Sequence, residues 1–578
     1  MEFSVWAPNP SRVDLVSGGE TVAMRRDDRS WWHVTLPGAG GGTRYAFSLD
    51  GGPPRPDPRS ASQPQGVHGP SEVVSPESFR WTDHQWRGLP LPGAVLYELH
   101  VGTFSPEGTF DGAARLLPHL VELGIDAIEL LPVAEFPGTR GWGYDGVDLF
   151  APHHSYGGPD GLRRLVDACH GHGIGVVLDV VYNHCGPSGN YLGEFGPYFS
   201  DTVETNWGAA VNFDGPGSDE VRRFVIDNAR MWLRDYHVDG LRLDAVHAII
   251  DRSALHILEE LAVEVDVLAA QLGRELLLIG ESDLNDPRFV RSRDAGGYGL
   301  DSAWADEWHH ALHAALTGER SGYYEDFGSL EQLGKALRQA WVYDGLWSAH
   351  RHRHFGRSPS GLRGDQFVVC TQNHDQVGNR ALGERAPLLM SEGRVKVAAA
   401  LLLTSPFTPL LFQGEEWGTR TPFQFFTDLE DPSLRSAVRE GRRREFARFG
   451  WDPHAVPDPE DVATFERSTL DWDERRQAPH DAVLGWYREL LALRRRVADL
   501  GDPRLEKIRV DADEAEGTLA VRRGAVLVLV NLARCDRKFH LGDVEVLAAS
   551  CPPLRQEGAC VVVPPDAVVI AGPPSRRP

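Results

Sequence analysis

Short apolar segments alternate with amphipathic ones between residues 95 and 417, and this alternation restricts the possible folds more than any other feature of the chain. Eight of the apolar segments have the length and composition of buried strands. They are VLYELHV (95–101), AIELLPV (127–133), GVVLDVVY (175–182), GLRLDAV (240–246), LLLIGES (276–282), SAWADEW (302–308), QFVVCTQNHD (366–375) and PLLFQGEEW (409–417). Amphipathic helices are predicted between several of them, near Phe110–Leu123, Pro159–His172, Asp219–Tyr236 and Asp251–Leu272. Alternating strands and helices are typical of a parallel sheet, and eight strands favour a closed (β/α)8 TIM barrel over an open sheet.

The segments on either side of this region show strand patterns without helical periodicity. Residues 1–88 contain FSVWAP, RVDLV, WWHVTL and RYAFSL between Gly- and Pro-rich stretches, which predicts an N-terminal β-sandwich like a carbohydrate-binding module. Trp31 and Trp32 are expected in its core rather than on a sugar-binding surface. Residues 501–578 return to strand patterns and predict a C-terminal β-sandwich. The multidomain α/β chain then has its barrel at 89–500, with insertions near 185–217 and 323–363.

Charge and composition argue against several kinds of partner. The 578 residues carry a formal net charge of −24, whereas nucleic acids and anionic membranes attract basic surfaces. No stretch approaches the roughly 18 uninterrupted apolar residues of a membrane-spanning helix. The first residues, MEFSVWAPNP, lack the basic and apolar regions of a secretory signal, and the six cysteines include no CxxC pair. We therefore expect a cytoplasmic protein with reduced thiols that binds neither nucleic acid nor membrane.

The segment GLRLDAVHAII (240–250) places Arg242 and Asp244 two residues apart on a predicted strand. Side chains at this spacing point to the same face. The guanidinium can then hydrogen-bond the carboxylate and hold it ionised, which is the state that a nucleophile needs. Taken alone, such an arginine–aspartate pair more often has a structural role than a catalytic one. The neighbouring motifs are needed to decide between the two roles.

Polar residues stand at the carboxyl ends of several predicted strands, where barrel enzymes carry their catalytic groups. They are Asp179, Asn183 and His184 on the third strand, Arg242, Asp244 and His247 on the fourth, Glu281 on the fifth, and His374 and Asp375 on the seventh. Three carboxylates converging on one barrel mouth raise each other's pKa values, which rarely serves stability. The crowding suits glycoside hydrolysis, which uses one ionised carboxylate and one carboxyl group kept protonated.

The motifs DVVYNH, GLRLDAVH, GESD and QNHD stand at these strand ends, and in this order they resemble the four signature regions of the α-amylase family of retaining glycoside hydrolases. The resemblance covers the whole barrel. It implies that Asp244 is the nucleophile, that Glu281 is the general acid and base, and that Asp375 holds the distorted sugar. It also implies a sugar-binding set that comprises Tyr144 (in GWGYDG), Asp179, Asn183, His184, Arg242, His247, Asp283, His374 and Gln376.

Details beyond the four motifs resemble one branch of this family, the malto-oligosyltrehalose trehalohydrolases. They are PDPRSASQPQGVHGPS, WGYDGVDLFAPHHSYG, NHCGPSGNYLGEFGPYF, GESDLNDPR, DEWHHALH and QNHDQVGNR. The resemblance implies hydrolysis of the α-1,4 bond next to the terminal trehalose of malto-oligosyl trehalose, with malto-oligosyltrehalose synthase as a functional partner in the pathway. It also places His309 and His310, at the end of the sixth strand, near the leaving disaccharide, although a structural role fits these two equally well.

Two other functions remain open from the sequence. A 1,4-α-glucan branching enzyme shares the N-terminal module and the catalytic carboxylates but transfers the sugar to a hydroxyl group instead of water. A non-catalytic glucan-binding member of the fold is disfavoured, because Asp244, Glu281 and Asp375 are all present. Product analysis separates the branching enzyme from the hydrolase, because branching changes the iodine stain of amylose without adding reducing ends.

No cofactor and no required metal are expected. Secreted amylases bind calcium near the position of Asn183 with ligands from a long insertion, and here that insertion is short. The stretch HRHRHFGRSPSGLRG is interpreted as a solvated basic loop, because no cysteine or carboxylate shares its spacing. GWGYDG also satisfies the dinucleotide fingerprint GxGxxG, but the following VDLFAPHH lacks helical periodicity, so a phosphate site is not expected.

Overall fold

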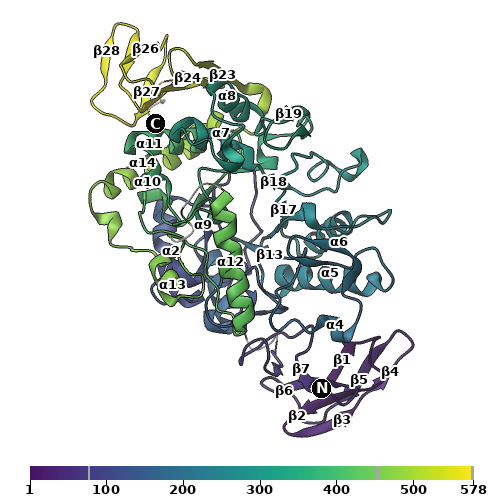
Figure 1. Ribbon diagram of the computed structural model, residues 1–578. Coiled ribbons are helices and arrows are strands. Elements are labelled where there is room, and N and C mark those ends of the chain that lie inside the picture. Colours follow the sequence, from purple (N-terminus) through teal and green to yellow (C-terminus); the bar gives the residue numbers. More distant parts are fainter. Residues whose placement is uncertain (76–78, 449–451, 453–454, 574–578) are drawn as a thin grey trace.

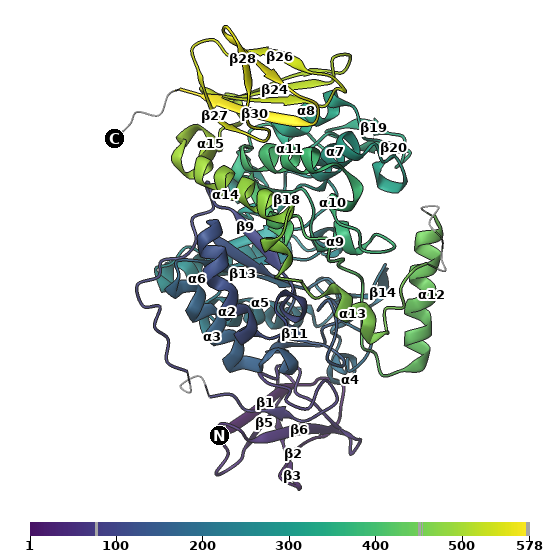
Figure 2. The same ribbon diagram turned by 90° about the vertical axis from the view of Figure 1, so that its left-hand side faces the viewer.

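The computed structural model describes residues 1–75, 79–448, 452 and 455–573, and it has three parts in a row (Figure 1). The N-terminal sheets lie at one end, the barrel occupies the middle, and the C-terminal sheets lie at the other end. The same order is visible after a quarter turn (Figure 2).

Eight parallel strands close into a barrel in the order β10-β13-β16-β17-β18-β21-β22-β9, so the predicted TIM barrel is confirmed. Their bounds are β9 Leu96–Leu99, β10 Ala127–Leu130, β13 Gly175–Val180, β16 Gly240–Leu243, β17 Leu277–Gly280, β18 Ser302–Trp304, β21 Phe367–Cys370 and β22 Thr408–Phe412. Each strand ends earlier than its apolar segment suggests. In QFVVCTQNHD, for example, the last residues turn away because Asn373 caps the short helix α9 (His374–Gly378).

The inside of the barrel changes from apolar to charged along the strands. Near the amino ends, inward side chains such as Leu96, Ala127, Val177 and Leu277 form one hydrophobic cluster. Two residues further on, the same inward face carries the buried side chains of Glu98, Glu129, Asp179 and Arg242. The charged layer therefore lies directly below the carboxyl-end loops.

Helices cover the outside of the barrel, and most of them are amphipathic. The main ones are α2 Phe110–Leu123, α3 Gly158–Gly171, α5 Ser218–Asp235, α6 Ile257–Leu272, α7 Asp306–Thr317, α11 Glu392–Leu403 and α14 His480–Arg496. In α5, Val221, Phe224, Val225, Trp232 and Leu233 are all buried, as the periodicity of the segment predicts. Shorter helices are α1 Val101–Phe104, α10 Ala386–Leu389, α13 Val462–Ser468 and α15 Ala498–Gly501.

Each flanking domain is built from two sheets. The N-terminal sheets have the strand orders β1-β5-β4 and β3-β2-β6-β7, with β8 beside β6. The C-terminal sheets have the orders β23-β24-β25-β30-β27 and β26-β29-β28. The strands are β1 Glu2–Trp6, β2 Val13–Ser17, β3 Glu20–Ala23, β4 Arg25–Arg26, β5 Trp31–Thr35, β6 Arg44–Leu49, β7 Pro54–Arg55, β8 Ser71–Glu72, β23 Ile508–Asp513, β24 Thr518–Arg523, β25 Val526–Asn531, β26 Arg537–His540, β27 Glu545–Ala549, β28 Arg555–Glu557, β29 Cys560–Val563 and β30 Ala567–Gly572. Trp32 is buried and Trp31 packs against the same core.

The two insertions contribute small elements beside the carboxyl ends of the strands. The first contains α4 Leu192–Phe195 and a hairpin of β14 Phe199–Thr205 with β15 Gly208–Val211. The second contains α8 Leu330–Gln339 and a hairpin of β19 Leu346–Ser348 with β20 Arg353–Phe355. HRHRH forms the turn and the start of the second strand of this hairpin, and its three histidines are exposed. Another hairpin pairs β11 Ala134–Glu135 with β12 Asp148–Pro152. In Figure 2, β14, β20, α9 and the long helix α12 (Pro432–Arg448) all lie toward the right-hand side.

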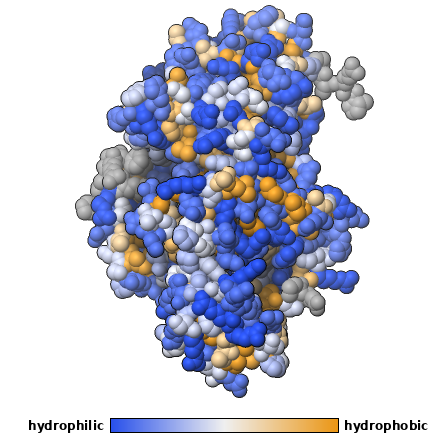
Figure 3. Space-filling view, turned by 90° about the vertical axis from the view of Figure 1, so that its right-hand side faces the viewer, coloured by the Kyte–Doolittle hydropathy of each residue, from blue (hydrophilic) through white to orange (hydrophobic). Residues whose placement is uncertain are grey.

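The surface agrees with the acidic, polar composition. Hydrophilic residues dominate the face drawn in Figure 3, and hydrophobic ones form small separate patches. Within the described ranges, the helices lack the combined length and apolar character that crossing a membrane requires.

Candidate active site

Arg242 lies at the centre of a polar cluster where the barrel strands end, and its side chain is fully buried. Nη1 donates to Asp179 Oδ2 at 2.9 Å and to Asp244 Oδ1 at 2.8 Å, while Nη2 lies 3.2 Å from Glu281 Oε2. The Trp304 ring covers the guanidinium, with 4.4 Å between the guanidinium carbon and the ring centroid. One fixed cation therefore contacts carboxyl groups from three successive strands, β13, β16 and β17.

A sharp turn after β16 presents Asp244. Its Oδ2 accepts a hydrogen bond from Asn183 Nδ2 at 2.7 Å, in addition to the Arg242 contact of Oδ1. Ala245 has a φ of 40°, in the left-handed region that residues other than glycine seldom adopt. In this conformation its backbone N–H donates to Glu281 Oε2 at 2.7 Å. The unusual backbone thus links the two carboxyl groups through one turn.

Glu281 and Asp244 have different electrostatic environments. Burial raises the pKa of Glu281, and the Asp244 and Asp375 carboxylates add to this effect while Arg242 opposes it. Asp244 accepts hydrogen bonds from a cation and from an amide, which hold its carboxyl group in a fixed position. The raised pKa of Glu281 suits a general acid, and the fixed Asp244 carboxyl group stands where a retaining mechanism needs its nucleophile.

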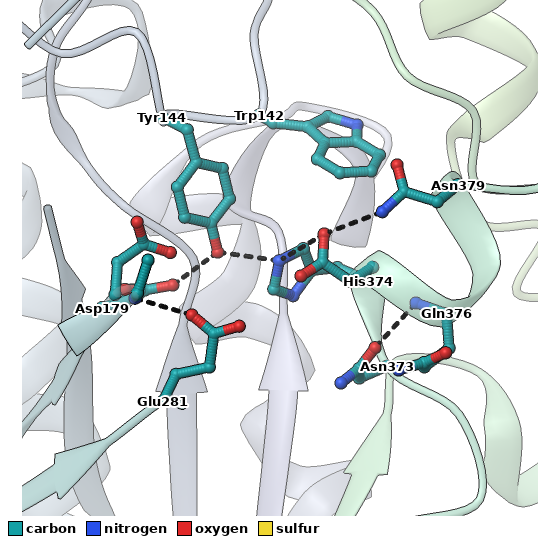
Figure 4. A network of polar contacts seen from close by, with 12 residues as sticks. Trp142, Tyr144, Asp179, Glu281, Asn373, His374, Gln376 and Asn379 are labelled. Carbon is teal, nitrogen blue, oxygen red and sulfur yellow. Dashed lines mark hydrogen bonds and ion pairs between the residues drawn. The ribbon is translucent and has the colours of Figure 1, made fainter. Parts of the chain in front are cut away.

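Asp375 follows His374 on helix α9 and is the most open of the three carboxyl groups, with 39% of its side chain exposed. Its Oδ1 accepts a hydrogen bond from Asn379 Nδ2 at 3.3 Å. Asn373 holds the start of the helix by accepting the Gln376 backbone N–H at 2.8 Å. Figure 4 shows Asn373, Gln376 and Asn379 on one side of the cluster, opposite Glu281. Asp375 is thus free to contact a ligand from the open side.

Tyr144 connects two parts of the cluster (Figure 4). Its hydroxyl lies 2.6 Å from Asp179 Oδ2 and 2.8 Å from His374 Nε2, and its ring stacks on His374 with centroids 5.3 Å apart. Burial raises the pKa of Asp179 to about 7, although Arg242 opposes the effect. His184 Nε2 lies 3.1 Å from the Tyr144 carbonyl oxygen. The structure thus brings together Tyr144, Asp179, Asn183, His184, Arg242 and His374 of the predicted sugar-binding set.

His309 and His310 do not end the sixth strand, contrary to the sequence-based expectation. Both lie on helix α7, because β18 stops at Trp304 and the helix begins at Asp306. His309 is buried, and both of its ring nitrogens are occupied, by the Thr371 carbonyl at 2.7 Å and the Tyr324 hydroxyl at 2.8 Å. His310 packs among aromatic rings, and burial lowers its pKa to about 3. This arrangement leaves His309 in a structural position and His310 as a neutral ring.

Three further predicted residues lie on the elements that carry the cluster. His247 is half-buried in the turn Val246–Ala248, and its Nδ1 has no hydrogen-bond partner among the described residues. Asp283 pairs with Arg351 of the second insertion, with 3.2 Å between Oδ2 and Nη1. Gln376 is on α9, and its Oε1 is likewise buried without a partner in the described part of the chain. Unpaired atoms of this kind can serve a hydroxylated ligand.

The structure also shows site residues that the sequence patterns did not reveal. Glu98 contacts His374, and Glu129 lies beside it on the neighbouring strand. The sequence signal that could have indicated these two residues is a single glutamate inside each otherwise apolar strand segment, LYEL for Glu98 and AIEL for Glu129. Asp306 is a further carboxyl group of this region, and burial raises its pKa to about 8, with Glu281 and Asp375 adding to the effect.

Trp207 is a fourth residue missed by the sequence patterns. It lies in the turn between β14 and β15, stacks on His184 with centroids 5.6 Å apart, and keeps 47% exposure. A partly exposed tryptophan beside a polar site offers a flat apolar face for a sugar ring. The aromatic-rich composition of the first insertion was the signal, but it did not single out this side chain.

Potential metal ligands gather at a different place. Among the described residues, Glu135, His153 and His154 form a group that could hold an ion. His154 Nδ1 already lies 2.6 Å from Glu135 Oε1, and the three residues belong to the β11–β12 region, outside the cluster around Arg242. Asn183, the position linked with calcium in secreted amylases, has its amide nitrogen on Asp244.

The glycines of GWGYDG serve a tight turn. Gly143 has a φ of 100°, and a Cβ atom there would lie 2.1 Å from the Pro132 carbonyl oxygen. The chain then continues into strand β12 and not into a helix. The arrangement differs from the strand–turn–helix unit of dinucleotide-binding proteins.

Comparisons with known proteins fit this geometry. The family model for the alpha amylase catalytic domain matches residues 73–207. A malto-oligosyltrehalose trehalohydrolase from Arthrobacter ramosus is 55% identical over 535 residues, which is 92% of each chain. A candidate alpha amylase of known structure from Salmonella typhimurium is 38% identical, with a TM-score of 0.90 over 99% of this chain and 97% of that one. A 1,4-alpha-glucan branching enzyme from Pseudoalteromonas atlantica is 30% identical over 54% of this chain and 49% of that enzyme.

Proposed function

The chain belongs to the malto-oligosyltrehalose trehalohydrolases of the α-amylase family, and we propose that it hydrolyses the α-1,4-glucosidic bond next to the terminal trehalose of malto-oligosyl trehalose. The products are trehalose and a malto-oligosaccharide. The likeness to a relative of this name over almost the whole chain carries the assignment. The branching enzyme matches only about half of the chain, so the transferase alternative has weaker support.

We assign the first chemical step to Glu281 and Asp244. The Glu281 carboxyl group gives its proton to the glycosidic oxygen, the bond from that oxygen to the anomeric carbon breaks, and trehalose leaves. The Asp244 carboxylate attacks the anomeric carbon from the opposite side and forms a glycosyl ester. The support is geometric, because one guanidinium contacts both carboxyl groups, at 2.8 Å and 3.2 Å, and a retaining mechanism uses two neighbouring carboxyl groups.

The second step reverses the roles. The Glu281 carboxylate removes a proton from water, the water oxygen attacks the anomeric carbon, and the ester bond to Asp244 breaks. Two inversions at the same carbon give net retention of the α configuration. Asp375, exposed on the open side of the cluster, would bind the sugar hydroxyl groups, and the Tyr144 ring would stack on the same sugar.

The substrate must come from an enzyme that converts the reducing end of a malto-oligosaccharide to trehalose. Malto-oligosyltrehalose synthase does this in the pathway that the family implies, and we propose it as the functional partner. The two enzymes need only share a metabolite, so no physical contact is required.

Product analysis tests the proposal. The protein is incubated with maltopentaosyl trehalose, with maltoheptaose and with amylose, and free trehalose, reducing ends and iodine staining are measured. Release of trehalose from the first substrate, with little change in the second, supports the hydrolase and places its specificity on the leaving-group side. Similar cleavage of both oligosaccharides, or a changed amylose stain without new reducing ends, contradicts it. Asp244→Asn serves as the inactive control.

A further inference from the structure

The first barrel strand, β9, carries a buried carboxylate that holds His374 in place. Glu98 is 1% exposed, and its Oε1 lies 2.6 Å from His374 Nδ1. Its Oε2 accepts the backbone N–H of His374 at 2.9 Å. One carboxylate therefore binds both the ring and the backbone of the residue that directly precedes Asp375. Glu98 lies in the barrel interior beneath these groups and does not itself line the open side.

The Glu98 contact decides the charge of the ring. Burial alone would lower the pKa of His374, but the Glu98 and Asp375 carboxylates raise it to about 9. The ring is therefore an imidazolium at neutral pH. The charged and titratable groups that face it are Glu98 on β9, His100 after β9, Glu129 on β10, Tyr144 before β12, Asp179 on β13, Arg242 on β16 and Asp375 on its own helix.

The charged ring also fixes the direction of a chain of hydrogen bonds. An imidazolium donates from both nitrogens, through Nδ1 to Glu98 and through Nε2 to the Tyr144 hydroxyl oxygen at 2.8 Å. The single Tyr144 proton then points to Asp179 Oδ2 at 2.6 Å. In a neutral ring that keeps its Nδ1 proton, Nε2 would become an acceptor and would compete with Asp179 for the tyrosine proton.

We propose that Glu98 is a positioning residue of the hydrolytic site, which keeps His374 as an imidazolium and sets the hydrogen-bond direction through Tyr144 to Asp179. The inference rests on the proposed function. It has an electrostatic reason, because the transition state of glycoside hydrolysis carries positive charge on the sugar ring. A single imidazolium nearby would repel that charge, whereas the Glu98–His374 pair offers a strong donor with no net charge.

Glu98→Gln tests the proposal, with Glu416→Gln as the matched control. Both changes replace a buried carboxyl group that contacts a histidine ring with an amide of the same shape, because Glu416 Oε1 lies 2.8 Å from His119 Nε2. The partners of Glu416 are His119 on α2 and the Tyr97 hydroxyl, and neither belongs to the cluster around Arg242. A simple packing defect would affect both variants alike.

Two readouts are needed, and the first requires no substrate. NMR of the histidine-labelled protein follows the ring of His374, assigned with a His374→Asn sample. We expect the wild-type ring to stay protonated up to a pH of about 9, and the ring in Glu98→Gln to be neutral at neutral pH. The second readout is kcat and KM for trehalose release, where we expect Glu98→Gln to lower kcat by about tenfold to a hundredfold and Glu416→Gln to stay within about twofold.

Either of two results would overturn the proposal. One is a wild-type His374 that loses its proton near the usual value of about 6.5 or below. The other is a Glu98→Gln enzyme with a neutral His374 and an unchanged kcat. If this variant does not fold, the wild-type titration alone decides. A wild-type protein that releases no trehalose would refute the proposed function, while the titration would still test the role of Glu98.

Discussion

Arg242→Met removes the cation that joins Asp179, Asp244 and Glu281, and its consequences can be worked out from the contacts. Methionine fills much of the same volume under the Trp304 ring but offers no donor. Three carboxyl groups that lie 2.8–3.2 Å from guanidinium nitrogens would then face one another across a buried space. The enzyme loses both the partner of its nucleophile and the link between nucleophile and acid.

The structure limits the size of the effect. Two unit charges about 4 Å apart interact by about 4 kcal/mol at an effective dielectric constant of about 20, and desolvation offsets much of this. Removal of one partner from a buried ion pair costs about 3–5 kcal/mol. We expect the lower end, about 3 kcal/mol at neutral pH, because burial lets Asp179 and Glu281 hold protons and avoid part of the repulsion. For a chain of this size the expected decrease in Tm is about 2–3 °C.

The penalty depends on pH with a definite sign. Burial already raises the folded-state pKa values of Asp179 and Glu281, and loss of the guanidinium should raise them further. Such groups destabilise the fold once they ionise, so the loss should be largest at neutral pH and should shrink as acid restores the protons. For catalysis we expect kcat to fall by at least about a thousandfold, since even one electrostatic donor is worth about a hundredfold to a thousandfold.

Thermal unfolding at two pH values and trehalose release measure both effects. The control is Arg476→Met, because this arginine is 72% exposed and pairs with the exposed Asp473, a contact worth less than about 1 kcal/mol. A variant at Arg242 that unfolds at the wild-type temperature and keeps kcat within about tenfold would refute the reasoning.

Four further expectations follow from the site. Burial raises the pKa of Glu281, so kcat/KM should fall once the pH is high enough for this carboxyl group to lose its proton. A kcat/KM that instead rises on the alkaline side would contradict the role of Glu281 as the acid. Glu281→Gln should lose about 10⁴-fold in kcat on the natural substrate yet still react with a glycosyl fluoride, whose leaving group needs no proton, whereas Asp244→Asn should fail on both. Trp207→Ala should raise KM by about tenfold with an unchanged Tm, because the ring is 47% exposed and packs mainly on His184; a lowered Tm would point to a structural role. Glu129→Met should raise the free energy of unfolding by about 1–3 kcal/mol, and Tm with it, because Oε2 of this buried carboxyl group has no hydrogen-bond partner in the described chain; a destabilised variant would show that a partner exists.

Much of the barrel was predictable because its strands carry strong local signals. Inward and outward faces are both apolar near the amino ends, so each strand appears as a short continuous apolar run such as GVVLDV. The polar residues Asp244 and Glu281 come directly after such runs, which places them at the catalytic end of the barrel. Membership of the family was also predictable, because the four motifs are local stretches of sequence.

The boundaries of the elements were harder to predict. In SAWADEW the strand covers only Ser302–Trp304, and a helix begins two residues later at Asp306. Aspartate is as typical of a first helical turn as of a strand end. The apolar pattern continues across the boundary with Trp308, so His309 and His310 were assigned to the strand although they lie on the helix. Because the strand ends earlier than expected, His309 lies buried on the helix and not at the strand end, where a ligand contact was expected.

The role of Glu98 was not predictable from local patterns. Its partner His374 is 276 residues away, and the two meet only because β9 closes the barrel between β10 and β22. Strand β22 in turn neighbours β21, the strand that leads into α9. A glutamate inside an apolar strand signals that some buried partner exists, but it does not identify the partner. Contacts set by closure of the barrel require the three-dimensional structure.

The position of Arg242 between two carboxyl groups gains meaning when the charges are followed through the proposed reaction. Before reaction the negative charge is on Asp244, and Glu281 holds a proton. After the first step Asp244 is an uncharged ester and Glu281 is the carboxylate, so the charge has moved from one residue to the other while its amount is unchanged. Nη1 contacts Asp244 at 2.8 Å and Nη2 lies 3.2 Å from Glu281, so the guanidinium faces a carboxylate in both states without moving. Because the cation is buried and covered by Trp304, little reorganisation is needed when the charge shifts, and this preorganisation is where an enzyme gains most over water.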